Sequence, residues 1–123
     1  MSIGVVLLTF LMGFAVWKLL TLQTTDSPII NIDDAVIIDV RSPTEFTSGH
    51  VQNAINVPID TITETDVLKH ASKDQPIVLY CRSGGRASIV HHRMKQWGFS
   101  NVHNLKTPSG VQNAMNPSLR QID

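Results

Sequence analysis

The sequence has a single cysteine, no net charge and no histidines at a metal-binding spacing. Cys81, being alone, cannot form an intramolecular disulfide, and it excludes a metal site built from several cysteines. The 10 basic residues balance 10 acidic ones, so no strongly basic surface indicates a nucleic-acid partner. The five histidines are scattered, and His91 and His92 lack the i, i+4 spacing of a helical metal pair. We therefore expect no structural metal and no nucleic-acid partner.

One long hydrophobic run is present, in residues 3–22, with Lys18 as its only charged residue. About 20 such residues cross the hydrocarbon core of a bilayer as a helix. The run lacks the basic n-region and the small-residue cleavage site of a signal peptide. The nearest candidate site, Thr25 to Ser27, is followed at once by a proline. We expect residues 1–23 to form an uncleaved membrane anchor, with a cleaved signal segment as the alternative.

The prediction of the side of the membrane on which the domain lies depends on a single residue. Lys18 lies at the C-terminal side of the apolar run, so the positive-inside rule places the domain that follows in the cytoplasm. A periplasmic or exported domain is the alternative. Residues 24–123 are enough for one compact domain with one core, and too few for two.

Short apolar runs alternate with helical patterns in this second part. Runs of β-branched and other apolar residues predict buried parallel strands at 35–40, 54–57, 77–80 and 101–105. Helices are predicted at about 42–48, 63–72, 86–97 and 110–115, the first with a capping box of Ser42 and Glu45. The alternation predicts an α/β fold, a small parallel sheet with helices on both faces, preceded by the N-terminal apolar helix.

Cys81 directly follows one of these strands and opens a loop that contains two glycines and two arginines, Cys81-Arg82-Ser83-Gly84-Gly85-Arg86. Ligands of such sheets bind at the carboxyl ends of the strands, where Cys81 falls. Glycines allow the positive φ of a tight anion-binding turn, and the N-terminus of the next helix favours a thiolate or a bound oxyanion. We interpret Cys81 as a nucleophile in an anion-binding cradle. An inert buried cysteine is the alternative, which the flanking glycines and arginines disfavour.

Two ordered stretches resemble the rhodanese domain family. The first runs from Asp39 to Phe46 and continues from Gly49 to Pro58, and the second is the loop from Tyr80 to Arg86. The resemblance covers roughly residues 29–115. It implies sulfane-sulfur transfer, in which a donor such as thiosulfate gives one sulfur to the Cys81 thiolate. Cyanide or another thiol then removes that sulfur from the persulfide.

The resemblance also implies roles for the residues of the loop. Cys81 is the nucleophile, and the persulfide and the departing anion are stabilised by the backbone N–H groups of Arg82, Ser83, Gly84, Gly85 and Arg86. Arg86 offers a bidentate donor fork to a sulfur oxyanion, while Arg82 binds substrate or raises the local positive potential. Four residues separate Cys81 from Arg86, where the cradle of cysteine phosphatases has five, which disfavours a phosphate ester. No cofactor is implied.

Residues outside the loop are expected to support it. Asp39 and Arg41 follow a predicted strand, and an ion pair or hydrogen bonds there could brace the loop; a solvated surface pair of little worth is the alternative. We expect His50 to pack and to form hydrogen bonds rather than act as a base, and His91 and His92 to lie at the surface. Residues 107–111 replace the Gly-Gly pair and tryptophan common in the family, which leaves acceptor preference open.

These observations predict a membrane-tethered thiosulfate sulfurtransferase. The alternative is a dedicated persulfide carrier that docks a protein partner at residues 107–111 and shows little thiosulfate:cyanide turnover. A third hypothesis, a redox-sensing or purely structural rhodanese-like domain, is disfavoured because both Cys81 and Arg86 are present.

Overall fold

The computed structural model describes residues 31–116. The predicted anchor, residues 1–23, lies outside the described residues. Among residues 31–116, no helix has both the length and the apolar character that crossing a bilayer requires.

A parallel sheet of four strands forms the centre of the fold, in the order β2-β1-β3-β4. Its strands are β1 (Val36–Asp39), β2 (Ile55–Asn56), β3 (Ile77–Tyr80) and β4 (Val102–Lys106). In the register of the central pair, Asp39 lies opposite Tyr80. The chain therefore leaves β1 and β3 side by side, at the same edge of the sheet.

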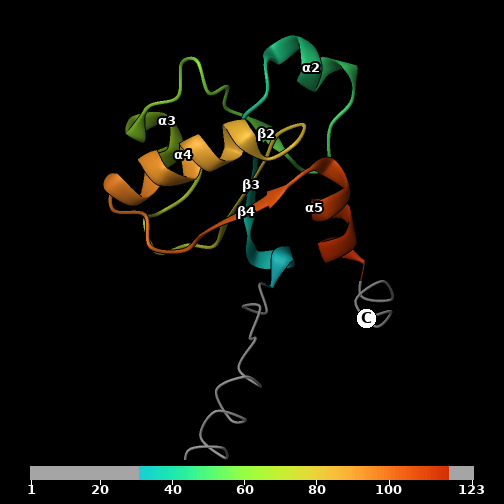
Figure 1. The fold of residues 1–123 in the computed structure, drawn as a ribbon. Coiled ribbons are helices and arrows are strands. Elements are labelled where there is room, and N and C mark those ends of the chain that lie inside the picture. Colours follow the sequence, from blue (N-terminus) through green and yellow to red (C-terminus); the bar gives the residue numbers. More distant parts are fainter. Residues whose placement is uncertain (1–30, 117–123) are drawn as a thin grey trace, which may run out of the picture.

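Helices cover both faces of this sheet, as predicted (Figure 1). One face packs against α3 (Glu64–Leu68) and α4 (Gly85–Gln96), and the other against α5 (Pro108–Met115) and the short 3-10 helix η1 (Ile32–Asp34). The remaining helix, α2 (Pro43–Ser48), lies beyond the carboxyl end of β1. Two clusters of buried apolar side chains, one on each face, hold the layers together.

The helix signals in the sequence are confirmed most clearly at α2. The Ser42 hydroxyl accepts a hydrogen bond from the Glu45 N–H, and the Glu45 carboxylate accepts from the Ser42 N–H, which completes the capping box. On α4, Ala87, Val90 and Met94 are fully buried, as the predicted helical spacing requires.

Several predicted boundaries were wrong by a few residues. The strand predicted at 54–57 is reduced to Ile55–Asn56. The helix predicted at 63–72 ends at Leu68, and Ser72 begins a separate turn through hydrogen bonds to Asp74 and Gln75. The C-terminal helix begins two residues earlier than predicted, since Thr107 rather than a later residue caps it.

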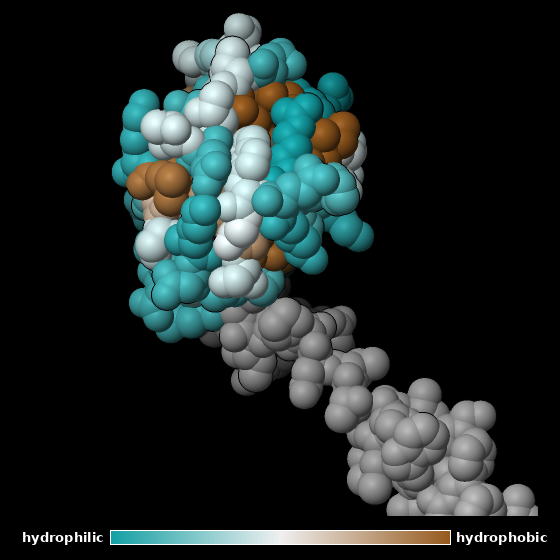
Figure 2. Space-filling model, turned by 90° about the vertical axis from the view of Figure 1, so that its left-hand side faces the viewer, coloured by the Kyte–Doolittle hydropathy of each residue, from teal (hydrophilic) through white to brown (hydrophobic). Residues whose placement is uncertain are grey.

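The outer surface of the α3–α4 side is largely hydrophilic. Figure 2 shows small hydrophobic areas that are separated by hydrophilic side chains. In residues 31–116 the exposed large hydrophobic side chains are Ile89 on α4, 50% exposed, and Leu68 on α3, 46% exposed.

Candidate active site

Cys81 is the first residue after β3 and is almost completely buried, with 1% of its surface exposed. Its backbone N–H donates a hydrogen bond to the carbonyl of Lys106, at 3.1 Å, which ties the start of the loop to the end of β4. Its Sγ atom accepts a hydrogen bond from the Gly84 N–H, at 3.0 Å. The loop thus closes around the thiol with its own backbone.

The surroundings of the thiol favour its ionised form. Burial alone raises the pKa of Cys81, because it penalises the charged thiolate. The backbone N–H groups of Ala87, Ser83, Gly84 and Arg86 act in the opposite direction and prevail, so the pKa lies below its ordinary value of 9.0. A larger fraction of Cys81 is therefore a thiolate at neutral pH than for a free cysteine.

Gly84 gives the loop its shape. Its φ of +99° lies in the left-handed region, where a side chain is strained, and a Cβ there would lie 3.0 Å from Cβ of Lys106. The Asn104 amide donates to the Gly84 carbonyl, at 3.3 Å. Because Gly84 is the N-cap of α4 and has no side chain to cap it, the first N–H groups of the helix stay available to the thiol.

Two of the predicted loop residues, Arg82 and Ser83, are exposed to solvent, whereas Arg86 is partly buried. The Arg86 guanidinium is paired with the Glu45 carboxylate through two hydrogen bonds, of 2.7 Å and 3.0 Å. The donor fork that we expected for a sulfur oxyanion is thus occupied by a side chain of the protein. Hydrogen bonding to Arg86 is the main reason why the pKa of Glu45 falls to about 2.

Sequence reasoning missed this second role of Glu45. The residue completes the capping box of α2 and also binds Arg86, 41 residues further along the chain. The pair joins the first motif to the end of the Cys81 loop. Only the first role has a local sequence signal, because capping boxes are recognised by spacing and long-range ion pairs are not.

Asp39 and Arg41 form the predicted ion pair, and the pair is buried. Asp39 is completely enclosed, and the Arg41 guanidinium donates to both of its carboxylate oxygens at 2.7–3.0 Å. Arg41 also donates to the Gly49 carbonyl, at 2.7 Å, and the Asn56 amide donates to the carbonyls of Asp39 and Arg41. The alternative of a solvated surface pair is wrong.

The pair reaches the Cys81 loop through Tyr80. The Arg41 guanidinium lies over the Tyr80 ring, 5.6 Å from its centroid. The Tyr80 hydroxyl in turn accepts a hydrogen bond from the Val51 N–H, at 3.0 Å. The first motif therefore fixes the residue that directly precedes Cys81, and the predicted bracing would act along this route.

Comparison with known proteins assigns the chain to a domain family. The profile of the rhodanese-like domain matches residues 23–107. The chain belongs to the rhodanese-like domain family. A solved rhodanese with anions from E. coli is 26% identical, with a TM-score of 0.57, over 62% of this chain and 89% of that one. A rhodanese-related protein from Thermoplasma volcanium is 28% identical, with a TM-score of 0.54, over 69% of this chain and 80% of that one.

The relatives found by sequence similarity include tRNA uridine(34) hydroxylases, whose names differ from that of the family. The tRNA uridine(34) hydroxylase of Buchnera aphidicola subsp. Baizongia pistaciae is 37% identical over 78 residues, which are 59% of this chain and 25% of that protein. The hydroxylase of Yersinia pestis is 36% identical over 83 residues, 63% of this chain and 23% of that protein. The chain thus spans about a quarter of the length of these relatives.

The histidines of the rhodanese-like domain take different positions. His50 stacks on Phe46, with 3.7 Å between ring centroids, and its Nδ1 lies 2.9 Å from the Phe46 carbonyl oxygen, so it packs and forms a hydrogen bond as predicted. His92 is exposed. His91, predicted at the surface, is half-buried, and its Nε2 atom is enclosed without a hydrogen-bond partner among residues 31–116. Burial lowers the pKa of His91.

Residues 107–111 form the N-cap and the first turn of α5. The Thr107 hydroxyl accepts a hydrogen bond from the Gly110 N–H, at 3.0 Å. A Cβ on Gly110 would clash with the Leu105 carbonyl, so glycine permits the close approach of helix and strand. Figure 1 shows that α5 starts at the same end of the sheet as α2 and the loop before α4.

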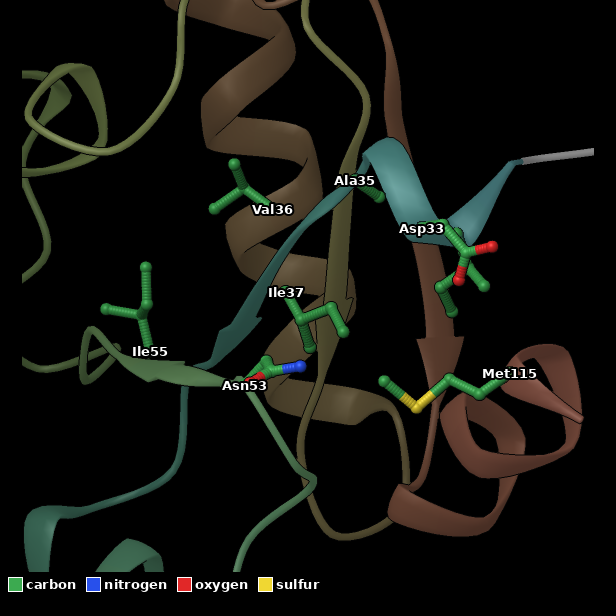
Figure 3. A pocket seen from close by; sticks show the side chains of 8 residues that line it. Asp33, Ala35, Val36, Ile37, Asn53, Ile55 and Met115 are labelled. Atoms are coloured by element: carbon green, nitrogen blue, oxygen red, sulfur yellow. The ribbon is translucent and has the colours of Figure 1, made fainter.

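A separate pocket of about 320 Å³ lies away from the Cys81 loop (Figure 3). Its lining comes from η1 and β1 with the residue between them, from β2 and the segment before it, and from the end of α5. It comprises Ile32, Asp33, Ala35, Val36, Ile37, Asn53, Ile55 and Met115. None of these residues belongs to the loop.

Among residues 31–116, no three His, Cys, Asp or Glu side chains are grouped so that they could hold a metal ion.

Proposed function

We propose that this rhodanese-like domain transfers a sulfane sulfur by way of a persulfide on Cys81. The observation that carries the proposal is the enclosure of the thiol by backbone N–H groups, with Gly84 donating to Sγ at 3.0 Å. The same N–H groups lower the pKa of Cys81 despite its burial. They provide a reactive thiolate and a place where negative charge is stabilised.

In the first half-reaction, the Cys81 thiolate attacks the outer sulfur of thiosulfate. A new S–S bond forms, the S–S bond of thiosulfate breaks, and sulfite leaves with the electron pair of that bond. The product is a Cys81 persulfide anion, which the N–H groups of the loop are placed to stabilise. The step starts from the thiolate form of Cys81, which the lowered pKa favours, and it transfers no proton.

In the second half-reaction, cyanide or a thiolate attacks the terminal sulfur of the persulfide. The S–S bond to Cys81 breaks and returns the electron pair to Sγ. With cyanide the product is thiocyanate, and the thiolate is regenerated. Covalent catalysis of this kind divides one difficult transfer into two displacements.

A dedicated persulfide carrier is the second candidate, and the Glu45–Arg86 pair favours it. Since the Arg86 fork is occupied by Glu45, less positive charge is free to bind a dianion such as thiosulfate. A protein persulfide would then be the donor and a protein thiol the acceptor. The tRNA hydroxylases support only the family of this domain, because the chain spans about a quarter of the length of each.

We also propose that residues 3–22 anchor the domain to a membrane, with the domain on the cytoplasmic side. The support is the apolar run with Lys18 as its only charge. Resistance of the full chain to extraction from membranes by alkaline carbonate is the expected result. Release of the intact chain into the soluble fraction would contradict the anchor.

The test of sulfur transfer is the intact mass of the full chain, held in mild detergent. We expect thiosulfate to add the mass of one sulfur to the reduced protein. A cyanide chase should then remove that mass and yield an equal amount of thiocyanate. If thiosulfate adds nothing to folded, reduced protein while a persulfide donor does, the carrier is the better description. If neither donor adds sulfur, the proposal fails.

A further inference from the structure

Three cationic residues lie in or next to the Cys81 loop, and they are not equivalent. Arg86 is already paired with Glu45. Arg82 and Lys106 are exposed, and neither forms an ion pair within residues 31–116. Of these two, only Lys106 lies outside the loop, at the end of β4.

A β-bulge brings Lys106 to the site. Along β3 and β4, Leu79 lies opposite Asn104, but the next residue, Tyr80, lies opposite Lys106 instead of Leu105. The extra residue turns Lys106 toward the chain that continues from Tyr80 into Cys81. Bulges next to active sites commonly redirect a side chain in this way.

The backbone of Lys106 is held in an unfavourable conformation by groups of the site. Its φ is +73°, a region that lysine rarely adopts. The Lys106 N–H donates to the Asn104 side-chain oxygen, at 2.9 Å, and its carbonyl accepts from the Cys81 N–H, at 3.1 Å. The Asn104 amide also donates to Gly84. Strain of this kind persists where the surroundings impose it, and it gathers at functional sites.

The stem of Lys106 lies against the part of the loop that binds the thiol. A Cβ on Gly84 would lie 3.0 Å from both Cβ and Cγ of Lys106, and the Gly84 N–H is the donor to Sγ. The flexible stem carries a compact charge that can turn over the loop. No carboxylate among residues 31–116 is paired with that charge.

We propose that Lys106 is a specificity-determining residue that recruits a small oxyanion donor to Cys81, with Arg82 as a second cation. The donor class is a sulfane sulfur attached to an oxyanion, of which thiosulfate is the simplest member. Lys106 takes over the part that Arg86 would play if Glu45 did not occupy it. The inference rests on the proposed sulfur transfer.

The test separates the two half-reactions in Lys106→Met and in a matched control. Methionine keeps an unbranched stem and removes the charge. Lys95→Met removes an exposed lysine near the end of α4, away from the loop. Persulfide formation is followed with thiosulfate, and persulfide removal with dithiothreitol, a thiol that carries no oxyanion group. Thermal melts verify folding, and Lys106→Arg restores the charge on a similar stem.

We expect Lys106→Met to raise the thiosulfate concentration for half-maximal persulfide formation about fivefold or more, and to weaken its dependence on salt. Removal of the sulfur by dithiothreitol should proceed as in the unmodified chain. Lys95→Met should change neither step, and Lys106→Arg should recover most of the thiosulfate affinity.

Equal thiosulfate affinity in Lys106→Met and Lys95→Met would overturn the role of Lys106 and leave the proposed function intact. Equal slowing of both half-reactions would also overturn it, since that pattern indicates a distorted loop. Absence of any persulfide in the unmodified chain, with thiosulfate and with a persulfide donor, would instead refute the proposed function itself.

Discussion

The chain leaves β1 and β3 at the same edge of the sheet, and the two exits are stabilised in opposite ways. After β1, the buried charge of Asp39 is balanced by the side chain of Arg41, with Asn56 and Gly49 completing the network. After β3, the buried Cys81 thiol is surrounded by backbone N–H groups. One exit is fixed by side chains and the other by the shape of the main chain.

This difference separates stability from reactivity. In a buried ion pair each side chain is satisfied by the other, so neither is free to bind a ligand. The segment after β1 is therefore suited to stabilise the fold. N–H groups at the start of a helix can share their charge with a thiolate, a persulfide or a bound anion. Substitutions after β1 should therefore act mainly on unfolding, and substitutions after β3 mainly on chemistry.

The strongest test of this division is Cys81→Ser. A serine hydroxyl is nearly isosteric with the thiol but is a far poorer nucleophile at neutral pH. We expect thiocyanate production from thiosulfate and cyanide to fall at least about a thousandfold. The thermal midpoint of unfolding should stay close to that of the unmodified chain. Residual turnover near the original rate would show that the sulfur does not pass through Cys81.

Asp39→Asn should have the largest effect on stability. The amide keeps the size of the side chain but leaves the Arg41 guanidinium, only 12% exposed, without its counter-charge. Breaking a buried pair by removing one partner costs about 3–5 kcal/mol. Urea unfolding measures the loss, with Asp60→Asn on the exposed surface as the control. If the two variants are equally stable, the pair after β1 is not a structural support.

The loop glycines allow a finer test of the exit after β3. Gly84→Ala places a Cβ in a left-handed backbone, at a cost of about 1–2 kcal/mol, and presses it against Lys106. We expect the N–H of residue 84 to move away from Sγ, so that the pKa of Cys81 rises. Alkylation by iodoacetamide across a range of pH measures this shift, because only the thiolate reacts.

Two other glycines separate strain from function. Gly98→Ala imposes a similar strain, at φ +93°, far along the chain from the thiol, and should lower stability without changing alkylation. Gly85→Ala meets no atom within 4 Å and should be tolerated. If all three variants alkylate with the same pH dependence, the Gly84 N–H does not set the reactivity of Cys81.

Local patterns in the sequence predict most of the fold and point to the candidate site around Cys81. The strand before Cys81, the capping box of α2 and the buried face of α4 all follow from the spacing of neighbouring residues. Cys81 is predicted as a nucleophile because glycines and arginines beside a thiol are poor filling for a core. These features depend on a few consecutive residues, which sequence reasoning can assess.

The features that the sequence did not reveal depend on residues far apart in the chain. Glu45 has a complete local role as a capping residue, and nothing nearby indicates its second partner, Arg86. Lys106 reaches the loop through a bulge that contains no glycine or proline to mark it. The enclosure of His91 likewise depends on how α4 packs on the sheet. Each of these contacts is determined by how distant elements pack together, and not by the spacing of residues along the sequence.

The Glu45–Arg86 pair links the segment after β1 to the Cys81 loop after β3. Its titration should have the smallest effect of these tests. The pKa of Glu45 lies at about 2 in the folded chain, below its usual 4.5, chiefly because Arg86 donates to it. The folded chain therefore binds this proton only at lower pH than the unfolded chain does. Its contribution to stability is complete above pH 4.5 and is lost as the pH falls toward 2.

Carbon NMR of the side-chain carboxyl groups can follow this titration directly. We expect a midpoint of about 2 for Glu45, and a clear rise toward the usual value in Arg86→Ala. Asp66 is an internal control, since its lowered pKa depends first on Thr63 and not on Arg86. A Glu45 midpoint that does not move would mean that Ser42 alone holds the carboxylate. The exits after β1 and β3 would then be independent, and only Tyr80 would connect the first motif to Cys81.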